Sequence, residues 1–453
     1  MSTPVDGLIV AAPASGSGKT SVTLGLLRSL ARAGGGVASA KVGPDYIDPA
    51  FHAAASGRPC RNLDTWAMRP ETIQAAIASL GHDADMILCE GVMGLFDGAR
   101  GDTTPADGST ASLARLTGWP VLLVVDASAQ AASAAAVVRG FATHDPQVPI
   151  AGVVFNLVGS PSHAAILRDA MAASLPDIPV LGCLPRRDDL SLPSRHLGLV
   201  QALEHADLPA FLDRAADWIE AHTDRDQLTA LFSTGTAQAP VSAGPPLPAL
   251  GARIAVARDA AFAFVYPHVL DGWRDAGADL SFFSPLADEA PASDTDAVYL
   301  PGGYPELHGA KLATNDGFRR GMEDARGRGA ALFGECGGYM VLGDSLTDAD
   351  GTDHAMLGFL PLATSFAARQ LHLGYRKITL RADGALGAAG AVFRGHEFHY
   401  ASIVRETDAQ PLFQATNAAG EDLGGVGLVR DRVAGSFIHM IDYCDTAAKG
   451  VGR

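Results

Sequence analysis

Short apolar runs, each followed by Gly, Pro, Asp or Asn and then by an alanine-rich stretch, recur along the first half of the chain. This alternation is typical of strands that are each followed by a helix. The runs are nearly unbroken and rich in branched residues, which predicts strands buried on both faces of a parallel sheet. They cover residues 8–11, 37–42, 86–89, 121–125, 150–155 and 180–184. We therefore predict a doubly wound, mainly parallel sheet with helices on both faces.

The pattern is interrupted about halfway along the chain. Between residues 224 and 251 the composition shifts to Thr, Gln, Ala, Pro and Gly, and turn-forming residues are densest at 239–246. Strand candidates then resume at 253–257, 297–300, 331–333 and 375–380. We predict two α/β domains, 1–235 and 251–453, joined by a linker at 236–250.

Composition and charge exclude several classes of protein. With 47% hydrophobic and 19% charged residues in 453, the chain has the profile of a globular protein rather than a disordered one. A net charge of −16 argues against a nucleic-acid or anionic-membrane binder held by a positive field. No apolar run approaches the roughly 20 residues of a membrane helix. The first residues lack the basic region of a signal peptide, so we expect a cytoplasmic location. The five scattered cysteines predict neither disulfides nor a zinc ribbon.

A glycine-rich segment follows the first predicted strand and opens a predicted helix, which is the setting of a phosphate-binding loop. Its backbone N–H groups can approach phosphate oxygens, its lysine supplies a point charge, and its threonine hydroxyl can bind Mg²⁺. Pro13 stands where the usual pattern has its first glycine. The predicted nucleotide-binding residues are Ser15, Gly16, Ser17, Gly18, Lys19 and Thr20.

Acidic residues follow the later predicted strands, at the sheet edge where ligands of open α/β sheets bind. One segment holds Asp45, Tyr46 and Asp48, and another holds Glu90 and Asp97. Carboxylates in turns also serve local hydrogen bonds. Next to a phosphate loop they predict a Mg²⁺ and substrate site, with Thr20, Asp48 and Glu90 as metal ligands and Asp45, Tyr46 and Asp97 facing the substrate.

Two further polar residues end strands in this half. Asp126 closes the run at 121–125 and is a weaker candidate for the same site. Asn156 closes the run at 150–155, where it either donates to a purine ring of the nucleotide or caps a turn.

The second half contains a strand, a tight turn and a helix start with Cys336 at the apex. This arrangement is typical of an activated nucleophile, because a helix amino end lowers a thiol pKa and the turn exposes the sulfur. The adjacent glycines after the strand at 297–300 predict an oxyanion hole formed by the N–H groups of Gly303 and Gly337. His439 ends a later strand-like run and is the candidate general base.

In combination these motifs resemble the cobyrinic or hydrogenobyrinic acid a,c-diamide synthases of cobalamin biosynthesis. The resemblance runs nearly end to end and is highly specific. It implies an ATP-binding amidoligase domain similar to dethiobiotin synthetase, followed by a class I glutamine amidotransferase domain. It rests on residues 15–20 (SGSGKT), 41–49 (KVGPDYIDP), 90–97 (EGVMGLFD), 192–198 (LPSRHLG), 283–286 (FSPL), 301–306 (PGGYPE) and 395–400 (GHEFHY).

The resemblance implies amidation of the a and c acetate side chains of a carboxylate-rich corrin ring, with ATP and Mg²⁺. A substrate carboxylate would attack the γ-phosphate, and ammonia would displace the acyl phosphate. Cys336 would release that ammonia from glutamine through a thioester, with His439 moving the protons. Whether the ring already carries cobalt is left open, and so is a homodimer as the assembly.

Several alternatives are left open by the sequence. Class I amidotransferases commonly have Glu two positions after the histidine, but Met440 and Ile441 follow His439 here, so the third member of the site is unassigned. His396 and Glu397 face either the corrin substrate or a structural hydrogen-bond network. Other interpretations of the sequence are a cobyric acid synthase, a nickel-tetrapyrrole amidase, or a switch ATPase with an inactive amidotransferase scaffold. The switch ATPases usually carry an early lysine where Ala14 stands.

Overall fold

The computed structural model describes residues 5–101, 106–192, 194–195, 198–205, 207–235, 244–407 and 409–444. The chain divides into two compact units after residue 243. The short segments Ala67–Arg69 and Arg100–Gly101 group with the second unit. Of the predicted linker, residues 236–243 lie outside the described residues, as do Pro193, His196 and Leu197 of the 192–198 motif. In the described ranges no helix is long and apolar enough to cross a membrane.

Unit 1 contains a seven-stranded parallel sheet in the order β3-β2-β4-β1-β5-β6-β7. All six predicted strands are present, so this part of the fold prediction is confirmed. The structure adds β3, which the pattern missed because Arg61 and Asn62 interrupt its apolar character. The strands are β1 (Asp6–Ala11), β2 (Val37–Val42), β3 (Cys60–Leu63), β4 (Met86–Glu90), β5 (Val121–Asp126), β6 (Ile150–Val158) and β7 (Val180–Pro185), with a short pair β8 (Ser194–Arg195) and β9 (Gly198–Leu199) outside the sheet.

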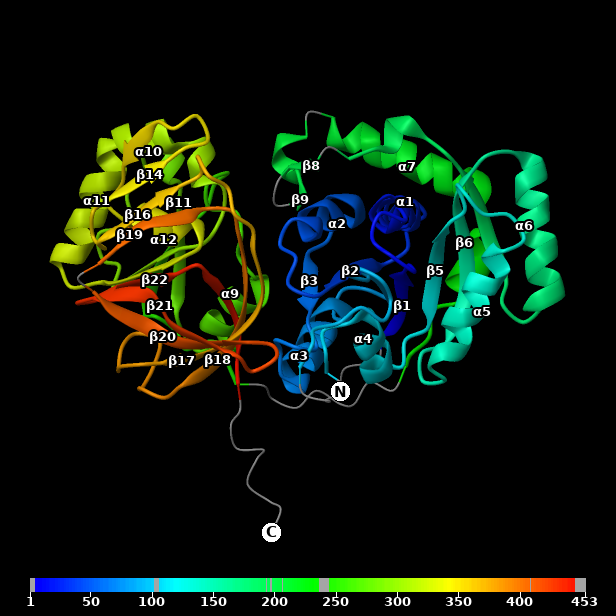
Figure 1. The fold of residues 1–453 in the computed structure, drawn as a ribbon, viewed down its shortest axis with the longest axis horizontal. Coiled ribbons are helices and arrows are strands. Elements are labelled where there is room, and N and C mark those ends of the chain that lie inside the picture. Colours follow the sequence, from blue (N-terminus) through cyan, green and yellow to red (C-terminus); the bar gives the residue numbers. More distant parts are fainter. Residues whose placement is uncertain are drawn as a thin grey trace, which may run out of the picture. The chain divides into compact units, whose positions relative to one another are not determined.

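Helices of unit 1 cover both faces of the sheet. Figure 1 shows α1, α2 and α7 together on one side of β1 to β3, and α3 and α4 on the other. The helices are α1 (Lys19–Arg32), α2 (Asp48–Ser56), α3 (Pro70–Gly81), α4 (Thr110–Thr117), α5 (Ala134–His144), α6 (Pro161–Ser174), α7 (Leu208–His222) and α8 (Arg225–Thr229). Because parallel strands end at one edge, the loops after β1, β2 and β4 lie next to one another.

Unit 2 is built on a mixed ten-stranded sheet in the order β11-β10-β12-β13-β22-β21-β20-β17-β18-β23. The first five strands of this order run parallel, and the others pair antiparallel. They are β10 (Arg253–Ala257), β11 (Asp279–Phe283), β12 (Ala297–Leu300), β13 (Ala331–Glu335), β17 (His372–Leu380), β18 (Val392–His399), β20 (Gln410–Asn417), β21 (Asp422–Arg430), β22 (Val433–Ser436) and β23 (Ile438–Tyr443). All four strand candidates of this half are confirmed.

A smaller four-stranded sheet and four helices complete the described part of unit 2. The sheet comprises β14 (Ser345–Thr347), β15 (Asp353–Ala355), β16 (Leu362–Ser365) and β19 (Ser402–Glu406). The helices are α9 (Pro267–Asp275), α10 (Gly309–Thr314), α11 (Asp316–Gly327) and α12 (Gly337–Leu342). Every residue of α12 is buried, and Cys336 belongs to the same apolar core. The helix that follows the nucleophile is therefore fixed by the removal of apolar surface from water rather than by its own propensity.

Candidate active sites

The phosphate loop lies between β1 and α1 and is held by its own polar groups. The Ser17 hydroxyl donates to the carbonyl of Ala14 (2.9 Å), and the Asn156 amide donates to the carbonyl of Ser17 (3.0 Å). Gly18 caps α1 with φ 84°, and a Cβ there would contact the Asn156 amide nitrogen. Only glycine accepts both the left-handed backbone and this close approach. Asn156, for which the sequence left open a purine contact or a turn cap, has its amide nitrogen engaged by the loop.

Lys19 begins α1 and its side chain is buried. Its ammonium donates to the carbonyl of Met93 (2.6 Å), in the loop that follows β4. Burial lowers the pKa of Lys19, an effect that Glu90 partly offsets. Met93 has a positive φ of 48°. The two loops therefore meet at the position where a phosphate-binding lysine is required.

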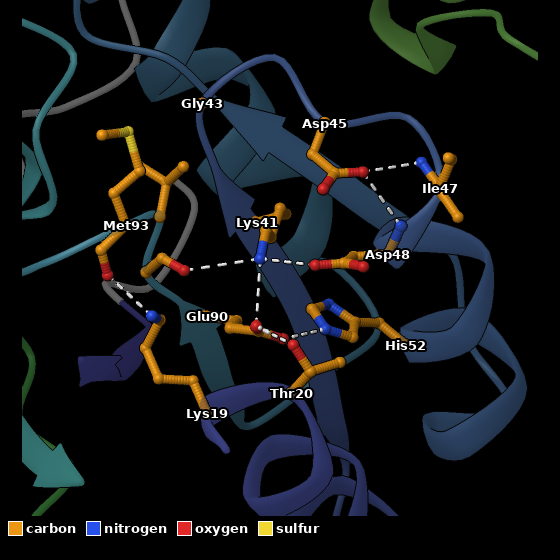
Figure 2. Close-up of polar contacts among 12 residues, drawn as sticks. Lys19, Thr20, Lys41, Gly43, Asp45, Ile47, Asp48, His52, Glu90 and Met93 are labelled. Atoms are coloured by element: carbon orange, nitrogen blue, oxygen red, sulfur yellow. Dashed lines mark hydrogen bonds and ion pairs between the residues drawn. The ribbon is translucent and has the colours of Figure 1, made fainter. Parts of the chain in front are cut away.

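Figure 2 shows a cluster of charges around Lys41, which lies on β2 and is 4% exposed. Its ammonium is 2.7 Å from an Asp48 carboxylate oxygen and 3.0 Å from Oε1 of Glu90. The Thr20 hydroxyl donates to the same Glu90 oxygen (2.7 Å). Burial alone would lower the pKa of Lys41, but Asp48 and Glu90 raise it above its usual value. The predicted metal ligands Thr20, Asp48 and Glu90 thus lie together.

His52 of α2 completes the cluster. Its Nε2 is 2.6 Å from Oε2 of Glu90, and its Nδ1 is 3.5 Å from the sulfur of Cys60. Burial lowers the pKa of His52, but the contacts with Cys60 and Glu90 outweigh this and raise it to about 10. Burial also opposes ionisation of Glu90, yet Lys41 and His52 hold the pKa of that carboxyl well below its usual range. Sequence reasoning assigned no role to Lys41 or His52. Lys41 could have been identified as a candidate because it is a lysine inside an otherwise apolar predicted strand, residues 37–42.

The remaining acidic candidates of unit 1 each use an oxygen in their own turn. Asp45 accepts from the backbone N–H groups of Ile47 (2.7 Å) and Asp48 (3.0 Å), and Asp97 accepts from Gly94 (2.8 Å). Asp126 accepts from the N–H of Ser128 (2.8 Å). Tyr46 is half-buried in the loop of Asp45. Each of these carboxylates therefore uses one oxygen for a hydrogen bond within its turn, which is the local role that the sequence allowed. The other oxygen of each can face a ligand.

The donor set of unit 1 fits a hard divalent cation. Thr20, Asp48 and Glu90 offer one hydroxyl and two carboxylates, which are the ligands that Mg²⁺ prefers. Lys41 already places a positive charge among these oxygens. This ammonium neutralises part of the negative charge, so the fit to a divalent cation rests on the ligand chemistry of the three side chains.

Cys336 lies at the turn between β13 and α12 with φ 47° and ψ −104°. A non-glycine residue in this region is strained, as expected of a nucleophile held at a sharp turn. The expectation of an exposed sulfur with a lowered pKa is wrong for this state of the molecule. Cys336 is 2% exposed, and burial, reinforced by Glu306, raises the pKa of its thiol.

His439 of β23 lies beside the nucleophile. A Cβ on Gly302 would contact the His439 ring, lying 3.0 Å from its Nε2, and would be 3.2 Å from the Cβ of Cys336. A Cβ on Gly337 would lie 3.0 Å from the backbone nitrogen of Gly303. The nucleophile, the candidate base and the two candidate oxyanion donors are thus brought together. Burial lowers the pKa of His439 to about 3.

Two acidic groups near His439 differ in their partners. Asp442, three positions after His439, is buried and accepts from the backbone N–H of Arg69 (2.8 Å), which belongs to the same unit. Glu335, which sequence reasoning missed, has Oε2 3.8 Å from Nδ1 of His439. Its position directly before Cys336 was the available signal.

Residues 8–200 match the CobQ/CobB/MinD/ParA nucleotide binding domain, and residues 253–444 match the CobB/CobQ-like glutamine amidotransferase domain. Hydrogenobyrinate a,c-diamide synthase of Brucella abortus biovar 1 (strain 9-941) is 55% identical over 98% of this chain and 100% of its own length. The chain belongs to the hydrogenobyrinate a,c-diamide synthase family.

Relatives of the same name from other bacteria support the assignment. The Rhizobium meliloti (strain 1021) protein is 53% identical over 97% of this chain, and the Rhodobacter capsulatus protein is 51% identical over 97% of this chain. Both matches cover 100% of the relative's own length. Among solved structures, PurLQS from Thermotoga maritima is 17% identical over 41% of this chain and 86% of its own, with a TM-score of 0.30.

Membership in the diamide synthase family confirms the resemblance and the two-domain α/β fold class. It also confirms an ATP-using ligase with a nucleotide-binding domain and a glutamine amidotransferase domain. The full-length relatives are named diamide synthases, which favours this activity over the cobyric acid synthase and switch-ATPase alternatives.

In this diamide synthase His396 and Glu397 do not share a face of β18, because successive residues of a strand point to opposite sides. His396 is paired in register with His439 and lies edge-on to Tyr375 (5.6 Å between ring centres). Glu397 forms an ion pair with Arg376 (2.7 Å) and contacts His399 (2.9 Å). Glu397 is thus part of the hydrogen-bond network that the sequence offered as the alternative, and the two residues cannot line one surface.

Proposed function

We propose that this protein amidates the a and c acetate side chains of hydrogenobyrinic acid, with ATP and Mg²⁺ in unit 1 and glutamine in unit 2. The observation that carries the proposal is the near full-length identity of 55% to hydrogenobyrinate a,c-diamide synthase. Of the two rings that the sequence left open, this identity favours hydrogenobyrinic acid, the ring without cobalt. Cytoplasm is the proposed location, which the five free cysteines support.

In unit 1 the phosphate loop binds ATP, and Lys19 exchanges its contact with the Met93 carbonyl for the phosphates. Thr20, Asp48 and Glu90 hold Mg²⁺, which supplies positive charge to the phosphates when bound. Asp45, Tyr46 and Asp97 face the corrin substrate. A substrate carboxylate attacks the γ-phosphorus, ADP leaves, and ammonia displaces phosphate from the acyl phosphate to give the amide.

In unit 2 Cys336 transfers its proton to His439 and attacks the carboxamide carbon of glutamine. The N–H groups of Gly303 and Gly337 stabilise the oxyanion that forms. The C–N bond breaks as His439 returns the proton, which releases ammonia and leaves a glutamyl thioester. Water then hydrolyses the thioester to glutamate and restores the thiol.

The proposal is tested by mass spectrometry of the purified protein with ATP, Mg²⁺ and glutamine. Hydrogenobyrinic and cobyrinic acid are offered in separate reactions. We expect two successive mass decreases, each equal to exchange of a hydroxyl for an amino group, and no third. Hydrogenobyrinic acid should react faster. Amidation of neither ring while ATP is hydrolysed would refute the function, and a faster reaction of cobyrinic acid would refute the choice of ring.

A Cys336→Ala variant separates the two units. We expect it to lose amidation with glutamine and to keep amidation with ammonium ion as the nitrogen source, because unit 1 is intact. A Lys19→Ala variant should lose amidation with both donors. Equal ammonium-dependent amidation by wild type and Cys336→Ala, with no glutamine-dependent amidation by either, would support the inactive-scaffold alternative instead.

A further inference from the structure

The group that orients His439 is not provided by the residues that follow it. Met440 and Ile441 carry no acid, and the carboxylate of Asp442 is bound by Arg69. A histidine that accepts a proton from a nucleophile requires a fixed ring and a counter-charge. Glu335 can meet both requirements. It ends β13 and directly precedes Cys336.

Glu335 lies on the Nδ1 side of His439. Its Oε2 is 3.8 Å from Nδ1, and both side chains are buried. Gly302 packs against the same ring, since a Cβ there would lie 3.0 Å from Nε2 and 3.2 Å from the Cβ of Cys336. The His439 ring thus has the Glu335 carboxylate near Nδ1, and the turn that carries the nucleophile lies close to it.

Two donors from other strands hold the Glu335 carboxylate. The hydroxyl of Tyr299 on β12 donates to Oε2 (2.7 Å), and the backbone N–H of Met440 on β23 donates to Oε1 (3.1 Å). Tyr299 is itself fixed edge-on to Trp273, with 5.3 Å between the ring centres. Both donors favour the ionised form of the carboxylate. These two hydrogen bonds hold the buried Glu335 carboxylate in place within the site.

We propose that Glu335 is the positioning residue of the glutaminase site, where it orients the His439 ring and stabilises the imidazolium that forms when Nε2 takes the Cys336 proton. It thereby replaces the acid missing after the histidine. The inference rests on the proposed glutaminase half-reaction, not on the identity of the ring that is amidated. At 3.8 Å the two groups are too far apart for a hydrogen bond in the resting state, and a small rotation of the imidazole would complete one.

The surroundings of His439 explain why this counter-charge is needed. Burial, followed by His396 and His399 of β18, lowers the pKa of His439, and Glu397 of the same strand only partly opposes them. Glu306 near Cys336 disfavours the thiolate. Burial also raises the pKa of Glu335 to about 7, against the Tyr299 and Met440 hydrogen bonds. Ionisation of Glu335 as the pH rises through about 7 should therefore increase the glutaminase rate.

The test compares Glu335→Gln, Glu335→Asp and Tyr299→Phe in the full-length protein. Glutaminase activity is measured as glutamate released from glutamine, and amidation is measured separately with ammonium ion. For Glu335→Gln we expect kcat of the glutaminase reaction to fall about 100-fold or more, with KM for glutamine within about threefold. Glu335→Asp should recover part of kcat. Ammonium-dependent amidation should stay at the wild-type rate, which reports an intact unit 1, and the retained KM for glutamine reports an intact glutamine site in unit 2.

The pH profile separates positioning from a merely structural role. The rise of glutaminase kcat near pH 7 should be absent in Glu335→Gln and displaced in Tyr299→Phe. A Glu335→Gln kcat within about threefold of wild type, or a loss confined to KM, would overturn the proposal. If Glu335→Gln loses ammonium-dependent amidation as well, the Tyr299→Phe variant becomes the test. An unchanged pH profile of glutaminase kcat in Tyr299→Phe would then overturn the proposal. Failure of wild type to amidate hydrogenobyrinic acid would refute the proposed function, but glutamate release would still test Glu335.

Discussion

Lys41 has a buried positive charge that two carboxylates from different elements balance. Asp48 begins α2, a short loop after Lys41, whereas Glu90 ends β4 and is distant in sequence. Removing one partner of such a group typically costs about 3–5 kcal/mol, because the remaining charges stay buried. The cluster is therefore stable only when all its members are present. The same arrangement places the carboxylates beside Lys19 and Thr20, where a nucleotide and its cation are proposed to bind.

A His52→Gln substitution tests the neutral-pH charge state of this cluster. The raised pKa of His52, about 10, lies above the value of about 6.5 in an unfolded chain, so its ion pair with Glu90 stabilises the fold fully below pH 6.5. This contribution is lost as the pH rises through about 10. We expect the variant to be less stable by about 1.5–3 kcal/mol at pH 6, with a smaller difference at pH 9.

Urea unfolding at both pH values measures this difference, and the exposed His82→Gln is the matched control. A His52→Gln stability difference that is equal at pH 6 and pH 9 would contradict an ionised His52.

The phosphate loop depends on a residue from a distant element. Gly18→Ala would place a methyl group against the Asn156 amide and impose a left-handed backbone on alanine. We expect ATP affinity to fall about tenfold or more, since each effect costs roughly 1–2 kcal/mol. Gly34→Ala, which has the same φ requirement at the end of α1 but no neighbour within 4 Å, should lose stability without losing ATP affinity. Calorimetric titration with ATP measures both, and equal affinities in the two variants would contradict this role of Gly18.

Elements were predictable from sequence to different degrees. The buried parallel strands of unit 1 are continuous apolar runs, and each predicted run is a strand. The antiparallel strands β18 to β21 were not predicted, because polar residues and glycines alternate with apolar ones and dilute the pattern. β18 illustrates this, since Arg394, His396 and Glu397 interrupt it. Their pairing with neighbouring strands, rather than composition, makes them strands.

At the scale of the whole molecule, the net charge of −16 opposes the approach of a polycarboxylate substrate. Salt screens this repulsion, so we expect kcat/KM for hydrogenobyrinic acid to rise at least about twofold as ionic strength increases from about 0.02 to about 0.3 M. Glutamine has no net charge, and kcat/KM for glutamate release is the control that should stay constant. A fall in kcat/KM for the ring with salt would instead indicate that positive groups at the site dominate its approach.

The sequence by itself determined the α/β class, the phosphate loop, the nucleophile and the family, because these depend on local patterns such as strand, glycine turn and helix start. The tertiary structure alone decided which groups share a site. Lys41 and His52 meet Glu90, and Glu335 meets His439, through strand order and register that no local spacing encodes. It also decided that Cys336 is buried, since solvent access depends on what packs over a turn. Contacts between distant segments form only when the sheets assemble, and there the chemistry of each side chain is set by its neighbours.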